Sequence, residues 1–213
     1  MIKVVGLGIG GSSAVIYDAL ERSEYLCSFV GWFDDDLSRK GTTHLDHPIV
    51  DSIDNIKLYK DFFDVAIICV GSTKNTKARN KIFTLIKKED IVLHSLVSPT
   101  ATVSKYTTLG KGCTILDGVV VNALATIGDN VFLNTGCIIE HDCTIGTSSF
   151  ISPRAVLCGN TKVEDNVFIG ANAVILGNIT IGANSTIGAG SVIISDVKPG
   201  STVVGNPGKV IKV

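Results

Sequence analysis

An aliphatic residue recurs at every sixth position through the second half of the chain. The series begins at Val97 and ends at Ile193, and all seventeen positions hold Val, Leu or Ile. Four residues after each of them lies a small or β-branched residue, as at Cys113, Ala125 and Ser185. A period of six fits neither an α-helix nor a simple alternating strand, so the pattern predicts short strands joined by turns and wound into a coil with a narrow interior.

Turn residues recur in the same register. Glycine follows the aliphatic residue at several positions, and Asn or Gly stands two places further on, where a tight corner requires a positive φ. The residues at these corners are Gly112, Asn130, Asn166, Asn172, Asn184 and Gly190. Three strands per triangular coil make one turn of 18 residues, so the repeat predicts a β-helix of a little over five coils. Equivalent residues of successive coils then lie roughly 4.8 Å apart.

The first 94 residues follow a different pattern. An apolar strand over residues 2–5 leads into a glycine-rich turn over 6–11 and a helix over 12–20, and further strands are predicted over 28–33, 65–70 and 91–93. His44 and His47 are predicted to lie in a polar loop before Pro48. The glycines formally satisfy a dinucleotide-binding motif. Four strands make only one mononucleotide half, however, which favours a single nucleotide or nucleotide sugar over NAD.

Composition narrows the choice of partner. The formal net charge is −1 and no run of Lys or Arg occurs, so the chain lacks the electrostatic footprint of a protein that binds nucleic acid or an anionic membrane. Its apolar runs are far shorter than the roughly 20 residues of a membrane span. Six cysteines without a CxxC pair or a signal peptide predict reduced thiols in a soluble cytoplasmic protein.

One histidine lies within the coils. His141 stands between Glu140 and Asp142, and a neighbouring carboxylate can fix the tautomer of an imidazole that acts as a base. Gly159 follows His141 by 18 residues, so its backbone N–H is predicted to lie on the next coil, within reach of the same reacting carbon. Without further context, an exposed and inert histidine remains an alternative. A zinc site is excluded because one histidine cannot supply the three that such a site needs.

The repeat over residues 97–193 resembles that of the hexapeptide-repeat acyltransferases, and the whole layout resembles the bacterial nucleotide-amino-sugar N-acetyltransferases and the related sialic acid O-acetyltransferases. The resemblance implies a half-Rossmann-like α/β domain over residues 1–94 that binds a nucleotide sugar. It also implies a left-handed parallel β-helix acetyltransferase domain with a C-terminal tail over residues 95–213. A homotrimer with active sites between subunits is a further implication.

The same resemblance assigns residues to roles. It makes His141 the general base, Asp142 its partner and Gly159 the oxyanion donor. The implied substrate-binding residues are Gly8, Gly10, Asp34, Asp35, Asp36, Gly71, Ser72, Asn134 and Phe150. The implied residues for acetyl-CoA are Gly159, Gly170, Ala171, Gly177, Ala189, Pro207 and Lys209, and no metal is implied. Many relatives carry a histidine in place of Gly10, and often a second one in place of Phe150.

The predicted activity is direct transfer of an acetyl group from acetyl-CoA to the amino group of a UDP- or GDP-linked 4-amino-4,6-dideoxy sugar, as in glycan biosynthesis. O-acetylation of a sugar such as sialic acid is the nearest alternative. A non-catalytic solenoid that binds a nucleotide and assembles complexes is the second.

Overall fold

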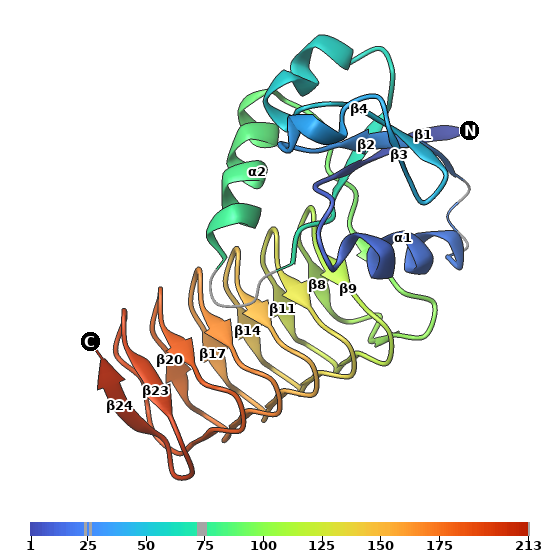
Figure 1. Ribbon diagram of the computed structural model, residues 1–213. Helices are drawn as coiled ribbons and strands as arrows, with labels where there is room; N and C mark the ends of the chain where they lie inside the picture. Colours follow the sequence, from blue (N-terminus) through green and yellow to red (C-terminus); the bar gives the residue numbers. More distant parts are fainter. Residues whose placement is uncertain (24, 26, 72–75, 213) are drawn as a thin grey trace.

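The computed structural model describes residues 1–23, 25, 27–71 and 76–212. A small α/β sheet domain lies where the coils of a parallel β-helix begin, and the C-terminal strand lies at the opposite end of the coils (Figure 1). The two predicted architectures are therefore both present. Across these residues, no helix is long and apolar enough to cross a membrane.

The described part of the front domain contains a five-stranded sheet in the order β3-β4-β2-β1-β5. The predicted strands over residues 2–5, 28–33 and 65–70 are confirmed, and the predicted helix corresponds to α1. The elements are β1 (Ile2–Leu7), α1 (Ser13–Glu21), β2 (Cys27–Phe33), the 3₁₀ helices η1 (Leu37–Arg39) and η2 (Ile53–Tyr59), β3 (Thr43–His44), β4 (His47–Asp51), β5 (Val65–Ile68) and α2 (Lys77–Lys88).

Two predictions for this domain are wrong. The polar loop before Pro48 is a hairpin in which β3 and β4 pair antiparallel, and β4 also extends the sheet beside β2. Leu45 and Asp46 form its turn, and both have positive φ. Leucine is rare in such a turn and proline is rare within a strand, so the sequence carries no ordinary hairpin signal here. The segment over residues 91–93 is not a full strand, because it joins β5 only through a bridge from Leu93 to Ala66.

The β-helix follows the six-residue period without a slip. Every predicted aliphatic residue is the second residue of a two-residue strand, and each strand from β6 to β19 pairs in parallel with the one 18 residues later, as Ile139 does with Leu157. The strands are β6 (Leu96–Val97), β7 (Thr102–Val103), β8 (Thr108–Leu109), β9 (Thr114–Ile115), β10 (Val120–Val121), β11 (Thr126–Ile127), β12 (Phe132–Leu133), β13 (Ile138–Ile139), β14 (Thr144–Ile145), β15 (Phe150–Ile151), β16 (Val156–Leu157), β17 (Lys162–Val163), β18 (Phe168–Ile169), β19 (Val174–Ile175), β20 (Thr180–Ile181), β21 (Thr186–Ile187) and β22 (Val192–Ile193).

The interior of the coils is narrow and apolar. The aliphatic residues point inward together with the small residues four positions later, and Cys113, Cys137 and Cys143 are buried there as predicted. Burial raises the pKa of Cys113 to about 11 and that of Cys137 to about 12, so these thiols fill the core rather than act as nucleophiles. The predicted corner residues take positive φ, for example +56° at Asn130.

The first residue of each strand points outward, and its chemistry differs among the three faces. We name each face by these residues. The threonine sheet (β20-β17-β14-β11-β8) carries Thr at four positions and Lys162 at the fifth, mostly exposed. The aliphatic sheet (β22-β19-β16-β13-β10-β7) carries five half-buried residues in register, namely Val120, Ile138, Val156, Val174 and Val192.

The third face is the phenylalanine sheet, in the order β24-β23-β21-β18-β15-β12-β9-β6, where β23 is Thr202–Val204 and β24 is Lys209–Lys212. It is partly covered by the front domain. The ring of Phe150 stacks between those of Phe132 and Phe168, with ring centroids 4.7 and 5.4 Å apart. These rings share a core with Ile16 of α1 and Trp32 of β2. The two domains are therefore joined by a common apolar core rather than by a linker alone.

Arg79 of α2 reinforces that junction. Its side chain is almost fully buried and has no carboxylate partner among the residues that the structure describes, and its guanidinium lies 5.2 Å from the ring centroid of Phe132. Its five N–H groups reach acceptors on both domains, so the charge is held entirely by neutral groups. The acceptors are the carbonyl oxygens of Ile68, Val70, Gly112 and Asn130 and the hydroxyl of Thr114. Burial lowers the pKa of Arg79 to about 10, which still leaves it charged at neutral pH.

The C-terminal segment closes the far end of the coils. Strand β23 (Thr202–Val204) pairs in parallel with β21, and β24 (Lys209–Lys212) folds back antiparallel on β23. The backbone N–H of Gly208 donates to the carbonyl of Val192, over a distance of 2.8 Å. Pro207 and Lys209 therefore lie at the last coil.

Candidate active site

His141 lies at the corner that follows β13. Its Nδ1 is 2.8 Å from Oδ2 of Asp142, which takes the positive φ of the corner, +60°. A carboxylate only accepts hydrogen bonds, so Nδ1 carries the proton of the neutral imidazole and Nε2 carries the free lone pair. The side chain of His141 is 58% exposed. The imidazole is thus oriented by its neighbour and open to a substrate.

Gly159 lies directly against this imidazole, as the 18-residue period predicts. A Cβ at position 159 would come within 2.6 Å of both Cε1 and Nε2 of His141, so only glycine leaves room for the ring. The carbonyl of Gly159 accepts from the N–H of Asn178, whereas its own N–H has no hydrogen-bond partner among the described residues. An unpaired amide beside a lone pair is the arrangement that general base catalysis of acyl transfer requires.

The neighbouring acid Glu140 is occupied elsewhere. Its Oε2 accepts from the side-chain amide of Asn122, one coil earlier, at 2.9 Å. Asp142 is therefore the carboxylate that serves His141. Across the described residues, no group of three or more His, Cys, Asp and Glu side chains could hold a metal ion.

The remaining predicted residues of the coils fall on two different edges. Gly177 lies on the next coil above Gly159, because a Cβ at Gly177 would be 3.0 Å from the carbonyl oxygen of Gly159. These residues share the edge between the aliphatic and threonine sheets. The opposite edge of the aliphatic sheet carries Asn134, Gly170, Ala171 and Ala189. One chain therefore does not bring Asn134 to His141.

Phe150 is not at either edge. It is only 2% exposed, and its ring is covered within the chain by the neighbouring phenylalanines. A ligand cannot reach it without displacing the core between the domains. The structure thus gives Phe150 a packing role and does not support the expected substrate contact.

The glycine-rich turn, the first acidic residue and the end of β5 meet as expected. Gly8 has a φ of +91°, and a Cβ there would collide with Cγ2 of Val70. The N–H of Ile9 donates to Oδ2 of Asp34 at 2.6 Å, and Gly71 packs against the side chain of Ser12. Ser72, predicted to bind substrate, lies outside the described residues.

Two hollows flank this turn. One, of about 220 Å³, is lined by Gly8, Gly10, Asp34 and Asp35 together with Lys81 of α2. The other, of about 550 Å³, is lined by Gly10 and by residues that sequence reasoning did not select. These are Arg39 at the end of η1, Thr42 between η1 and β3, and Thr43 and His44 of the unpredicted hairpin. Asp36 lines neither hollow, since it caps η1 and pairs with Arg39.

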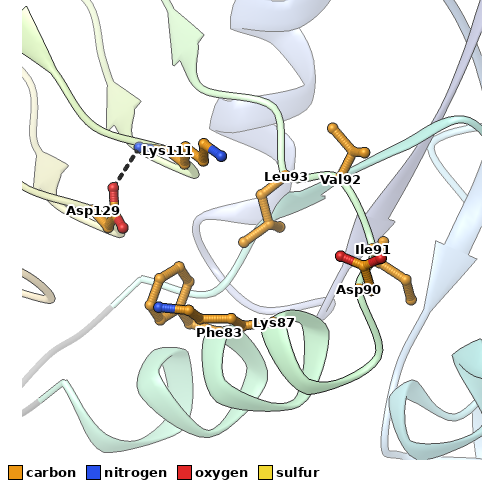
Figure 2. A pocket seen from close by; sticks show the side chains of 8 residues that line it. All are labelled: Phe83, Lys87, Asp90, Ile91, Val92, Leu93, Lys111 and Asp129. Atoms are coloured by element: carbon orange, nitrogen blue, oxygen red, sulfur yellow. Dashed lines mark hydrogen bonds between the residues drawn. The ribbon is translucent and has the colours of Figure 1, made fainter.

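A third cavity, of about 480 Å³, lies at the seam between α2 and the first coils (Figure 2). Phe83 and Leu93 form part of its apolar wall, and Lys111 and Asp129 come from the coil corners, where the N–H of Lys111 donates to Oδ1 of Asp129. None of the predicted site residues lines it. This cavity is therefore separate from the His141 corner and from the glycine-rich turn.

The coils match a known family. A family model described as bacterial transferase hexapeptide (six repeats) matches residues 124–159 and 160–195. The comparison with curated proteins gives no match.

Solved structures match nearly the whole chain. PerB from Caulobacter crescentus, in complex with CoA and GDP-perosamine, is 27% identical, with a TM-score of 0.88, over 98% of this chain and 96% of that one. The acetyltransferase domain of PglB from Neisseria gonorrhoeae FA1090, in complex with acetyl coenzyme A, is 30% identical over 98% of each chain, with a TM-score of 0.87. A histidine-to-asparagine variant of perosamine N-acetyltransferase from Caulobacter crescentus is 26% identical, with a TM-score of 0.90, over 99% of this chain and 97% of that one.

The contact between Gly159 and His141 can be tested by adding a methyl group. We expect Gly159→Ala to lower turnover at least about a hundredfold, because the new Cβ displaces the imidazole from its present position. His141 is exposed enough to swing aside, so the thermal unfolding midpoint should change little. The control is a double-mutant cycle with His141→Ala. Once the imidazole has been removed, Gly159→Ala should lower turnover almost no further. A fully active Gly159→Ala enzyme would show that the ring does not work from this position.

Proposed function

The chain belongs to the bacterial hexapeptide-repeat transferases, with their left-handed parallel β-helix, and from that premise we propose that it is an acetyl-CoA-dependent N-acetyltransferase of a nucleotide-linked amino sugar. The similar proteins supply the substrate class, since PerB is described with CoA and GDP-perosamine and the PglB domain with acetyl coenzyme A. The observation that carries the proposal is the imidazole of His141, held by Asp142 against Gly159, whose N–H pairs with no other described residue.

This arrangement fits a direct transfer. The neutral amine attacks the thioester carbon of acetyl-CoA, a C–N bond forms, and the negative charge that develops on the carbonyl oxygen is stabilised by the N–H of Gly159. Nε2 of His141 takes the proton that the amine loses. Asp142 stabilises the resulting imidazolium through Nδ1–H. The C–S bond then breaks, and the departing thiolate takes the proton from Nε2 of His141, which gives CoA and the acetamido sugar and restores the neutral imidazole.

The role of His141 has a direct kinetic test. We expect His141→Asn to lower kcat by about 10²–10⁴, the usual contribution of a general base. Acetyl-CoA binding and the unfolding midpoint should stay close to those of the wild type, because the side chain is exposed and supports no core contact. Steady-state assays should include a panel of UDP- and GDP-linked 4-amino sugars and free sialic acids. Full activity of the variant would refute the role of His141 as the general base. Acetylation of sialic acid alone would refute N-acetylation of a nucleotide sugar.

The outer faces of the coils support a homotrimer. Five aliphatic side chains stand in register on the aliphatic sheet and are only partly covered within the chain, whereas the threonine sheet is polar and the phenylalanine sheet is partly covered by the front domain. An apolar ladder of this kind is typical of a contact surface. Its two edges carry His141 and Asn134, so a cyclic assembly through this face brings the His141 edge of one copy toward the Asn134 edge of the next.

The proposed interface predicts that a negative charge on the aliphatic sheet, but not on the threonine sheet, changes the oligomeric state. Val156→Glu, in the middle of the ladder, should convert the trimer into monomers, because burying an unpaired carboxylate is costly. Thr144→Glu is the matched control, since it has the same strand position on the polar face and should leave the mass unchanged. Light scattering coupled to gel filtration measures both. A Val156→Glu protein that keeps the wild-type mass, or a monomeric wild type, would contradict the proposed interface.

The proposal also assigns a ligand to each of the two domains. The domain of residues 1–94 binds the nucleotide sugar, and the domain of residues 95–213 carries acetyl-CoA and the base. Gly170, Gly177, Ala171 and Ala189 on the coil edges, with the tail residues at the last coil, would contact the cofactor. The reaction belongs in the cytoplasm, where six unpaired thiols are stable.

A further inference from the structure

The larger hollow beside the glycine-rich turn has a cationic and polar lining. Arg39 and His44 supply its ionisable groups, Thr42 and Thr43 supply hydroxyls, and none of the described residues that line it is a carboxylate. A Cβ at Gly10 or Gly11 would meet no atom within 4 Å, so the turn backbone borders open space. The smaller hollow on the other side of the turn contains Asp34 and Asp35. Lys81 also lines the smaller hollow and pairs with Asp35, so that lining keeps a net negative charge and the larger hollow is the one that favours an anionic ligand group.

His44 is held rigidly at the wall of this hollow. Its ring lies edge-on to Trp32, with centroids 5.0 Å apart, and Nε1 of Trp32 donates to the backbone carbonyl of His44 at 2.8 Å. Trp32 is fully buried, so the hairpin that carries His44 is anchored to the core of the front domain. The position of the imidazole does not depend on a bound ligand.

Hydrogen bonding fixes which ring nitrogen of His44 is free. The hydroxyl of Ser13 donates its single proton to the carbonyl of Gly10 at 2.7 Å, so toward His44 it can only accept. Nε2 of His44, 3.0 Å away, therefore carries a proton and donates it. Nδ1 has no hydrogen-bond partner among the described residues. A second proton on the ring would thus create one new donor and a positive charge.

We propose that His44 is a phosphate-binding residue of this enzyme, and that Nδ1–H of its imidazolium donates to a phosphate oxygen of the nucleotide sugar in the larger hollow. This inference rests on the proposed function and deepens it, because it places the diphosphate between the hairpin and the glycine-rich turn. Arg39 adds a second positive charge. Its guanidinium is itself held by the carbonyl of Ile9 at 2.9 Å and by Asp36.

The charge state of His44 makes the proposed contact sensitive to pH. Burial, and then the charge of Arg39, lower the pKa of His44, while Asp34 raises it by a smaller amount. The empty site therefore holds a neutral ring near pH 7. A bound phosphate raises the pKa of the ring, so binding takes up a proton and becomes tighter as the pH falls from about 8 to about 6.

The test compares nucleoside diphosphates with nucleosides. Titration calorimetry with UDP and GDP, and with uridine and guanosine, is run on the full-length protein and on His44→Gln, whose amide can still donate to Ser13. We expect the variant to bind the preferred diphosphate about tenfold or more weakly and to lose the pH dependence, with nucleoside affinity unchanged. In turnover assays, KM for the nucleotide sugar should rise while kcat and KM for acetyl-CoA stay the same.

His47→Gln is the matched control. His47 belongs to the same hairpin, but it contacts the hydroxyl of Tyr17 and does not line the hollow, so this variant should bind diphosphates normally. The wild type offers a second readout that needs no variant, because calorimetry in buffers of different ionisation enthalpy should detect the proton uptake.

The outcomes separate this inference from the proposed function. A wild type that binds no nucleoside diphosphate or nucleotide sugar would overturn both. A wild type that binds a diphosphate, with equal affinity in His44→Gln or without proton uptake, would overturn the role of His44 alone. An equal loss of affinity for nucleosides and diphosphates would also overturn it, because the contact would then not be to phosphate.

Discussion

The parallel pairing of residues 18 positions apart is the constraint on which this structure depends. Each coil repeats the backbone of the one before it, so the side chain at one corner limits which residue types fit 18 positions later, at the same corner of the next coil. His141 therefore requires glycine at position 159, where a Cβ would collide with the imidazole. The N–H of Gly159, beside the ring, has no hydrogen-bond partner in the described part of the chain. The proposed base and the proposed oxyanion donor thus come from adjacent turns of a single repeating pattern.

The three faces of the β-helix differ in what they pack against. The phenylalanine sheet packs against the front domain, with Arg79 buried at that junction and bound to carbonyls of both parts. The aliphatic sheet carries the proposed contact with other copies of the chain, and the threonine sheet is mostly exposed. Val70, whose carbonyl accepts from Arg79, also packs against Gly8 of the glycine-rich turn. The position of the glycine-rich turn is therefore coupled mechanically to the first coils.

Much of this could be predicted from the sequence, because a six-residue period leaves little conformational choice. The strands, corners and the contact of His141 with Gly159 follow from counting residues. The hairpin that carries His44 does not, since Leu45 at positive φ and Pro48 within a strand both run against local preferences. The burial of Phe150 was also missed, because the sequence does not show which outward ladder the front domain covers. Local periodicity predicts coils well, but contacts between domains depend on long-range packing.

The most direct test of the central claim is a crystal structure of the wild-type protein with CoA and an amino-sugar acceptor. The account predicts that the acceptor nitrogen lies within hydrogen-bond reach of Nε2 of His141, about 3 Å away, with the CoA sulfur close by. The position of the thioester carbonyl oxygen should then face the N–H of Gly159. A CoA sulfur bound at another edge of the coils, or an imidazole turned away from the acceptor, would contradict it.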